Sequence, residues 1–344
     1  MSTGVVVWFE QLGRDDTATV GGKGANLGEL AGAGLPVPPG FVVTAAGYLH
    51  AMDEGGVRDD LRATFEEARL RADDPATLAD LAERLRSLVR KAGVPAGSRD
   101  EVLAAYHRLG AGSPVAVRSS ATAEDTAGTS FAGMHETYAN VVGDDAVIER
   151  LVDCWASLFG ERVIAYRASQ RLSEEPAIAV VVQQLVESER AGVLFTADPS
   201  SGDRDRIVVE GAFGLGEVVV SGQVEPDTYV LSKAGPRLAQ IRIGHKTHKL
   251  VGGPGGTIVR VDLGEEEADA RVLADGEAVA LARLGAEVEA HYGGVPQDVE
   301  WAIAGGRTYL LQARPITTLT DALPAAPAGP AAVGPVLLRG LAAS

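Results

Sequence analysis

The sequence predicts a protein of mixed helices and strands, arranged in at least two lobes. Its length of 344 residues exceeds the usual size of a single domain, so more than one hydrophobic core is expected. Segments with strand and helix patterns alternate along the chain without an obvious repeat. With 46% hydrophobic and 23% charged residues, the chain has the composition of an ordinary globular protein.

Charge, the amino terminus and cysteine content exclude several classes of protein. The formal net charge of -16, from 31 basic and 47 acidic residues, argues against a nucleic-acid surface, because phosphate backbones require clustered Lys and Arg. The amino terminus lacks the features of a signal peptide, and no run approaches the roughly 18 apolar residues of a membrane helix. The single cysteine, Cys154, excludes an internal disulfide and is read as a buried thiol. We therefore expect a cytoplasmic protein that binds neither nucleic acid nor membrane.

The first half of the chain is expected to begin with short strands and to continue with helices. Residues 5–9 and 41–44 have strand composition. In residues 57–91 the leucines recur at three- and four-residue spacing, which predicts helix. Within that region, Asp74 before Pro75 is the signal of a helix start, and Gly93 is expected to end the run.

A buried strand at residues 177–182 leads into residues 183–188, which we expect to be a hinge between the lobes. The lobes are therefore placed at residues 1–185 and 186–320. Residues 321–335 have the alanine- and proline-rich composition of a linker. The second lobe is expected to contain three further strands and one helix, at residues 192–196, 207–210, 228–231 and 277–292.

Near the end of the chain, two short apolar runs flank a glycine turn at residues 304–307, which predicts a β-hairpin. Strand side chains alternate between faces, so Gln312 and Arg314 point the same way, and Glu300 can join them from the facing strand. Such a set suits a magnesium-bound polyphosphate, because Mg²⁺ takes oxygen ligands and Arg grips phosphate oxygens in pairs. The alternative is a surface hairpin whose charges are merely solvated.

A glycine-rich segment at residues 21–28 places Lys23 just before a predicted helix, where backbone amides and the ammonium can meet an anion. The segment is not a Walker A loop, because Thr17 stands where the first glycine is required and Gly24 follows the lysine. The alternative is a flexible turn with a solvated lysine. A separate glycine pair at residues 214–216 lacks the third glycine of a dinucleotide fingerprint and is read as a tight turn.

A third segment, residues 117–125, ends a buried strand in Arg118 and two serines. An arginine that follows a buried apolar strand is unlike a surface arginine whose charge is only solvated. Arg118 is therefore either a phosphate ligand or the partner of Glu124 or Asp125 in a structural ion pair. A loop of small residues that includes Gly133 follows.

Taken in order, six segments resemble the ATP-binding domain shared by phosphoenolpyruvate synthase, pyruvate phosphate dikinase and rifampin phosphotransferase, with the synthases the nearest. The resemblance extends over roughly residues 5 to 318. It implies an α+β fold of the ATP-grasp type, in which two lobes close on the nucleotide, and it implies ATP and Mg²⁺ as cofactors. The six segments are residues 20–30, 116–125, 130–133, 214–217, 297–301 and 312–315.

The same resemblance assigns nine residues to the nucleotide site. Three cations would contact the phosphates and act in catalysis, two oxygen ligands would hold the metal, one glycine would belong to the phosphate loop, and three residues would read the adenine. They are, in that order, Lys23, Arg118 and Arg314; Glu300 and Gln312; Gly133; and Gln184, Leu185 and Val186.

Enzymes of this family carry the phosphoryl group on a histidine of a separate domain, and none of the six histidines stands in such a context. Residues 336–344 resemble the opening strand of that domain, cut short, so we expect a fragment or a stand-alone first domain. The predicted function is an ATP-binding module that uses Mg-ATP to phosphorylate a histidine on a partner domain. AMP and phosphate would be released, and phosphoenolpyruvate would form from pyruvate. The alternatives are the corresponding module of a rifampin-type antibiotic phosphotransferase and a non-catalytic ATP-binding regulator.

Overall fold

The computed structural model describes residues 4–122, 136–172, 174–316 and 319. These divide into two compact units. Unit 1 holds the described residues up to 185 together with 253–258, and unit 2 holds residues 186–252 and those from 259 onward. Each unit combines an antiparallel sheet with helices, which confirms the predicted α+β class. Within the described part of the chain, no helix has both the length and the apolar character needed to cross a membrane.

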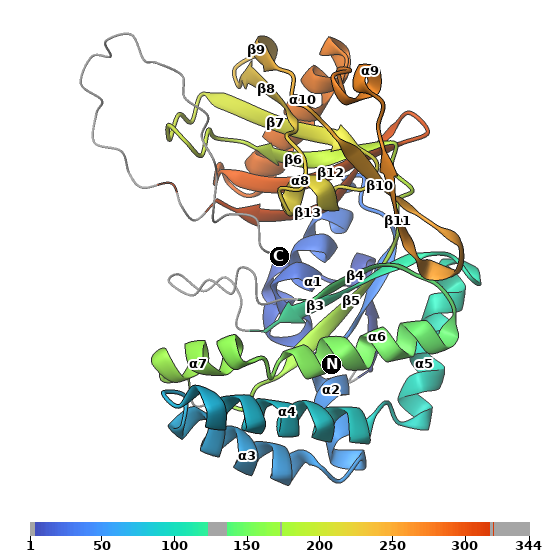
Figure 1. Cartoon of the computed structure of the whole chain (residues 1–344), viewed down its shortest axis with the longest axis vertical. Helices are drawn as coiled ribbons and strands as arrows, with labels where there is room; N and C mark the ends of the chain where they lie inside the picture. The colour runs from blue at the N-terminus through green and yellow to red at the C-terminus, as the bar shows by residue number, and fades with distance from the viewer. Residues whose placement is uncertain (1–3, 123–135, 173, 317–318, 320–344) are drawn as a thin grey trace. The chain divides into compact units, whose positions relative to one another are not determined.

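Unit 1 is built on a five-stranded sheet in the order β1-β2-β5-β3-β4, and all neighbouring strands are antiparallel. Strands β3, β4 and β5 of this sheet are labelled in Figure 1. Its strands are β1 Val6–Trp8, β2 Gly40–Val43, β3 Val115–Ala121, β4 Thr137–Val141 and β5 Ile178–Gln184. Its helices are η1 Phe9–Gln11, η2 Arg14–Asp16, α1 Thr17–Gly32, α2 Ala45–Glu54, α3 Arg58–Leu70, α4 Pro75–Ala92, α5 Ala96–Gly110, α6 Asp144–Ser157, α7 Glu161–Ser169 and η3 Pro254–Gly256.

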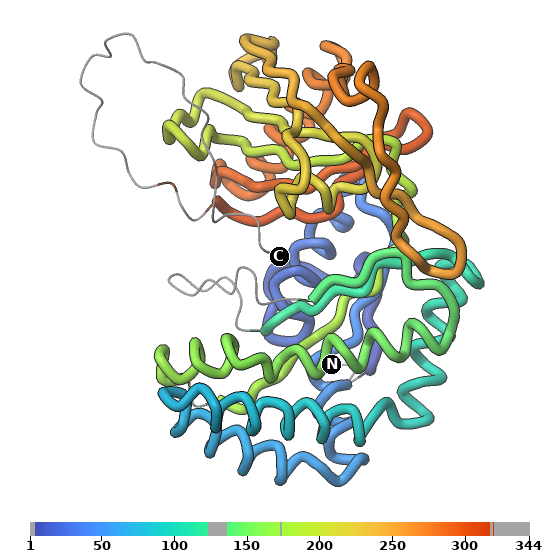
Figure 2. Tube along the Cα trace, in the orientation of Figure 1, coloured from blue at the N-terminus to red at the C-terminus, as the bar shows by residue number. Residues whose placement is uncertain are grey.

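The predicted helical region is two helices, α3 and α4, which lie side by side (Figure 2). The break falls where the cap was predicted, since the Thr77 N–H donates to Asp74 Oδ1 at 3.4 Å and Pro75 is the first residue of α4. Gly93 follows α4 with a φ of 61°, a conformation that favours glycine. The local signals therefore located both ends of α4 correctly.

Helices cover both faces of the unit 1 sheet. On one face, Val20 and Leu27 of α1 pack with Val42 and Val181 of the strands. On the other face lies the larger apolar cluster, which includes Cys154 of α6. Burial raises the pKa of the Cys154 thiol, which confirms the prediction of a buried thiol.

Unit 2 is built on a six-stranded antiparallel sheet in the order β13-β12-β6-β7-β8-β9. A two-stranded sheet of β10 and β11 accompanies it. The strands are β6 Arg190–Phe195, β7 Arg206–Phe213, β8 Asp227–Ser232, β9 Arg237–Arg242, β10 His248–Gly252, β11 Ile258–Asp262, β12 Gln297–Ala304 and β13 Arg307–Pro315. The helices are α8 Glu217–Val220, α9 Glu265–Ala268 and α10 Asp275–His291.

Helix α10 covers one face of this sheet. The helix approaches closely at Gly285, where an added Cβ would lie 2.4 Å from the Leu194 side chain. Arg190 at the start of β6 forms an ion pair of 2.7 Å with Glu277 on α10. Trp301 of β12 points to the same side as Leu194 and is fully buried. Apolar packing therefore occupies this face.

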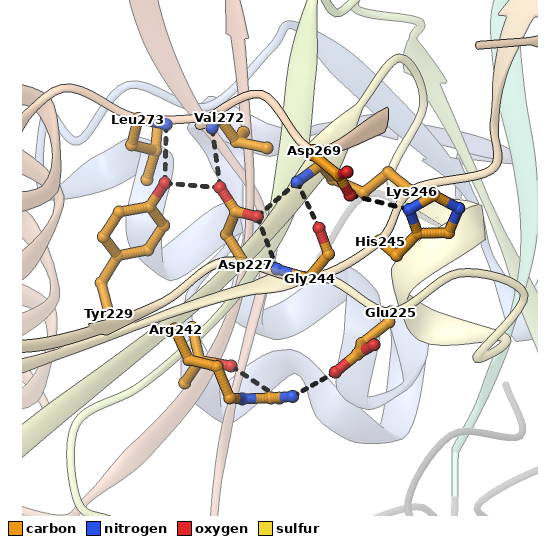
Figure 3. A network of polar contacts seen from close by, with 11 residues as sticks. Glu225, Asp227, Tyr229, Arg242, Gly244, His245, Lys246, Asp269, Val272 and Leu273 are labelled. Carbon is orange, nitrogen blue, oxygen red and sulfur yellow. Dashed lines mark hydrogen bonds and ion pairs between the residues drawn. The ribbon is translucent and has the colours of Figure 1, made fainter. Parts of the chain in front are cut away.

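A buried ion pair joins Lys246 to Asp227 at the start of β8, and both side chains are fully buried. Figure 3 shows Asp227 between Lys246 and Tyr229. One Asp227 oxygen accepts from Lys246 Nζ at 2.5 Å, and the other accepts from the Tyr229 hydroxyl at 2.9 Å and the Val272 N–H at 2.7 Å. Lys246 Nζ also donates to the Gly244 carbonyl at 2.9 Å. The network ties three separate segments of unit 2 together.

Replacing Lys246 by methionine is expected to lower the free energy of unfolding by about 3–5 kcal/mol, because Asp227 would remain as an uncompensated buried charge. Lys249 is the matched control, since its ion pair with Glu267 is partly exposed. Lys249→Met should cost less than about 1 kcal/mol. Urea unfolding of both variants measures the difference, and equal losses would contradict the assigned importance of the buried pair.

Candidate functional site

Arg118 lies on the face of the unit 1 sheet that α1 covers. In β3, Arg118 is directly opposite Val181 of β5, and Ser120 is opposite Ala179. Val181 and Ala179 belong to the apolar cluster that includes α1, and strand residues two apart share a face. The Arg118 side chain is buried, at 7% exposure, so it lies within the protein and not on the open surface.

Lys23 lies in the first turn of the longer part of α1. The helix is interrupted at Gly21, whose φ of 71° and ψ of 169° are not helical. Lys23 is therefore the second residue of the resumed helix, two residues after the break. The sequence predicted a position just before the helix. Backbone N–H groups in the first turn of a helix have no partner within that helix, so the lysine still stands where an anion can be bound.

The Lys23 turn and the Arg118 strand are in direct contact. A Cβ added at Gly21 would lie 2.2 Å from Ser120 Oγ, so the turn can approach β3 only because this residue is glycine. The Gly24 N–H also donates to Ser120 Oγ at 3.2 Å. Unit 1 thus brings the elements that carry Lys23 and Arg118 together on one face.

The predicted adenine-reading residues lie at the end of β5. The Gln184 N–H donates to the Pro39 carbonyl and the Leu185 N–H to the Pro114 carbonyl, both at 2.9 Å. Strand alternation puts the side chain of Gln183, and not that of Gln184, on the face that carries Arg118. Val186 begins unit 2, and its carbonyl accepts from the Ser188 N–H at 2.8 Å.

The hairpin of β12 and β13 pairs the residues that the sequence grouped together. Glu300 is directly opposite Gln312, with a register shift immediately after Glu300. Directly opposite residues point to the same face, with Cβ atoms about 4.5–5.5 Å apart. Arg314 lies two residues beyond Gln312 and shares that face. The face is the one opposite α10, because Glu300 and the buried Trp301 are consecutive.

Asp298 was not predicted as a site residue, yet it contacts Arg314 directly. The two residues are opposite each other in the register, and Arg314 Nε and Nη2 both lie 3.0 Å from Asp298 Oδ2. Burial raises the pKa of Asp298, and the Arg314 charge acts in the opposite direction. The alternation rule could have revealed Asp298, since it stands two residues before Glu300.

Another carboxylate, Glu210, lies on the same face and was also missed. Glu300 is opposite Val193 of β6, and Val193 is opposite Glu210 of β7. Glu210 therefore lies two strands from Glu300, or roughly 9–10 Å away at the usual strand spacing. Burial raises the pKa of Glu210. Nothing in the local sequence could place this residue two strands from Glu300 on the same face, because the strand order decides it.

Of the remaining predicted features, the structure describes the glycine pair at residues 214–216, and the others lie outside the described residues. The glycine pair is the tight turn that the sequence predicted, because Gly214 has a φ of 77° and its added Cβ would lie 2.3 Å from the Leu250 carbonyl oxygen. Gly133 and the two carboxylates proposed as partners of Arg118 lie outside the described residues, as do the predicted linker at 321–335 and the segment 336–344.

Comparison with known families defines the class of the protein, an AMP/ATP-binding domain. The chain belongs to the family described as pyruvate phosphate dikinase, AMP/ATP-binding domain, which matches residues 17–330. The structure shows the α+β class, with an antiparallel sheet and helices in each unit, and the ATP-grasp assignment stays a prediction of the resemblance. A D-alanine–D-alanine ligase structure from Bacillus anthracis covers 64% of this chain and 48% of its own, at 13% identity and a TM-score of 0.28, which is too weak to support a conclusion.

Curated relatives carry the name phosphoenolpyruvate synthase. The probable synthase of Methanothermobacter thermautotrophicus is 44% identical over 92% of this chain and 46% of its own length. The probable synthase of Archaeoglobus fulgidus is 44% identical over 98% of this chain and 45% of its own length. The synthase of Pyrococcus furiosus is 38% identical over 98% of this chain and 47% of its own length. The chain thus spans about half the length of these relatives.

Proposed function

We propose that this chain is the ATP-binding module of a dikinase-type phosphotransferase. It would use Mg-ATP to phosphorylate a histidine on a partner domain, with release of AMP and phosphate. The observation that supports this most is the pairing of Glu300 with Gln312 on the sheet face that also carries Arg314. The names of the relatives favour pyruvate as the final acceptor and phosphoenolpyruvate as the product.

The donor chemistry of the hairpin suits Mg²⁺. Glu300 would supply a carboxylate oxygen and Gln312 an amide oxygen, both hard ligands of the kind that Mg²⁺ prefers. Mg²⁺ usually binds through one or two protein groups together with phosphate oxygens and water, so two protein ligands are sufficient. The metal would neutralise part of the charge on the polyphosphate.

The three cations would neutralise the remaining phosphate charge. Lys23 and Arg118 would contact phosphate oxygens from unit 1, and Arg314 would do so from the hairpin of unit 2. Phosphoryl transfer leaves little covalent work to the protein, so positioning and charge neutralisation would be their contribution to catalysis. Asp298 would orient Arg314 by holding its guanidinium through two contacts of 3.0 Å.

The adenine and the phosphate loop complete the proposed site. Gln184, Leu185 and Val186 would meet the adenine at the end of β5, where the chain passes from unit 1 to unit 2. Gly133 would belong to the loop that lies against the phosphates. Both assignments come from the family resemblance.

Two other functions use the same residues differently. An antibiotic phosphotransferase of the rifampin type would share the nucleotide site and differ in the acceptor. A non-catalytic regulator would need disabled metal and phosphate ligands, whereas Lys23, Arg118, Glu300, Gln312 and Arg314 all have the residue types that catalysis requires. The family membership and the names of the relatives favour the synthase-type module over both.

The chain alone is expected to bind ATP in the presence of Mg²⁺ but to release AMP only slowly, because a partner domain supplies the acceptor histidine. Calorimetry measures binding, and an AMP assay with pyruvate or with rifampin measures turnover. Adding a separately produced phosphohistidine domain of a phosphoenolpyruvate synthase, with pyruvate, should accelerate AMP release. Rapid multiple turnover by the chain alone would contradict the proposal.

A further inference from the structure

Ser120 is a fully buried serine between the Lys23 turn and the strand that carries Arg118. Its side chain is 0% exposed, and it stands two residues after Arg118 on the same face of β3. Its hydroxyl donates to the Val20 carbonyl at 2.9 Å and accepts from the Gly24 N–H at 3.2 Å. The two partners of Ser120 therefore flank Lys23 in the chain.

The contact has the geometry of a helix cap supplied from another element. Gly21 stands at the non-helical position before the resumed helix, where a Ser, Thr, Asp or Asn side chain usually accepts from an N–H in the first turn. Gly21 has no side chain that can do so. The Ser120 hydroxyl takes over this role, because Gly24 is the third residue of the resumed helix.

The adjacent serine does not share this role. Ser119 points to the other face of β3, and its hydroxyl accepts from the Glu136 N–H at 2.9 Å. Within β3, Ser120 therefore provides the side-chain bonds to the two residues around the Gly21 break. Its loss would remove a capping bond beside Lys23 while leaving the ladder between β3 and β5 unchanged.

We propose that Ser120 is a positioning residue for nucleotide binding. Its two hydrogen bonds fix the position of the Lys23 backbone relative to Arg118. This rests on the proposed function, in which both cations contact the phosphates of ATP. The Ser120 hydroxyl itself touches no phosphate. It acts through Lys23, by fixing the first turn of the helix against the strand that carries Arg118.

The test is a double-mutant cycle on the whole chain, with calorimetric affinity for Mg-ATP as the readout. Ser120→Ala is expected to weaken Mg-ATP binding by up to roughly tenfold, the effect on affinity if the whole stabilisation of about 1 kcal/mol that a cap gives its helix were lost from binding. In a Lys23→Ala background the same change should cost less than about twofold, because mutations that act through one contact are not additive. Adenosine affinity should be the same with and without Ser120→Ala.

Thr44→Val is the matched control. Thr44 is also buried in unit 1, at 1% exposure, and its hydroxyl likewise accepts from a helix N–H, that of Gly47 at 3.1 Å, and donates to the Gly4 carbonyl at 3.3 Å. It caps α2, which carries no residue of the proposed site. Thr44→Val should lower the melting temperature without weakening Mg-ATP binding in either background.

The outcomes separate this inference from the function on which it rests. If Lys23→Ala alone leaves Mg-ATP binding unchanged, the phosphate role of Lys23 is wrong, and the inference is overturned with it. A second outcome is that Lys23→Ala weakens binding while Ser120→Ala, added to it, still lowers the logarithm of Mg-ATP affinity by more than half as much as it does in the wild type. In that case only the positioning role of Ser120 is wrong. An equal loss of affinity with Thr44→Val would also overturn it. Should Ser120→Ala not fold, Ser120→Cys, which weakens both hydrogen bonds at similar volume, gives the same cycle.

Discussion

Arg118→Lys is expected to reduce phosphoryl transfer on the order of 100-fold, the size of effect seen when one group that stabilises transition-state charge is removed. Lysine keeps the positive charge but loses the planar fork that grips two phosphate oxygens at once. The loss of unfolding free energy should be only about 1 kcal/mol, since the charge at this buried position is retained. AMP release with an added phosphohistidine domain measures the first effect, and urea unfolding measures the second.

Arg167→Lys is the control for this prediction. Arg167 is equally buried in unit 1, at 6% exposure, and its guanidinium donates to the Glu174 carbonyl at 2.8 Å. Arg167→Lys should lower stability without changing the rate of transfer. The phosphate role of Arg118 would be wrong if Arg118→Lys kept more than half of the transfer rate while losing as much stability as Arg167→Lys. That result would favour the alternative of a structural ion pair with Glu124 or Asp125.

Glu300→Ala is expected to abolish transfer and to weaken Mg²⁺-dependent ATP binding by at least about tenfold, because a carboxylate ligand of the metal is lost. The fold should remain intact, since Glu300 lies on the sheet face opposite the one that α10 covers. Calorimetry of ATP binding at several Mg²⁺ concentrations measures the metal dependence, and thermal unfolding checks the fold.

Glu210→Gln is the matched control for the metal assignment, because Glu210 lies on the same face two strands away. This variant should keep the native Mg²⁺ dependence of ATP binding. A Glu300→Ala protein that retains full transfer to an added phosphohistidine domain would refute the metal role of Glu300. If Glu300→Ala does not fold, Glu300→Met removes both ligand oxygens at similar volume, and the same loss of transfer and of Mg²⁺-dependent binding is expected of it.

Much of the candidate site on the hairpin could be predicted from local spacing. Gln312 and Arg314 share a face because strand side chains alternate, and the glycine turn brings Glu300 opposite Gln312. The same rule places Asp298 on that face, although the sequence alone did not indicate that it would bind Arg314. Polar groups in a short hairpin depend on a register that nearby residues set, so sequence spacing is informative there.

Other parts of the fold could not be predicted in this way. The strands from residues 237 to 262 were missed, and β9 and β11 are largely exposed, so they lack the apolar alternation of a half-buried strand. The pairing of Lys246 with Asp227 was missed as well, because a lysine between polar residues resembles a solvated one in sequence. Burial at these positions is decided by neighbours that are distant in the chain.

By itself, the sequence determined the mixture of helices and strands, the ends of α4, the β12–β13 hairpin and the residue types of the proposed site, because caps, turns and strand alternation act over a few neighbouring residues. Only the tertiary structure decided that α1 breaks at Gly21, that Ser120 caps the helix carrying Lys23, and that Glu210 shares a face with Glu300. The Gly24–Ser120 bond joins residues 96 positions apart, and strand order places Glu210. Such contacts form only when distant segments pack, so no local pattern encodes them.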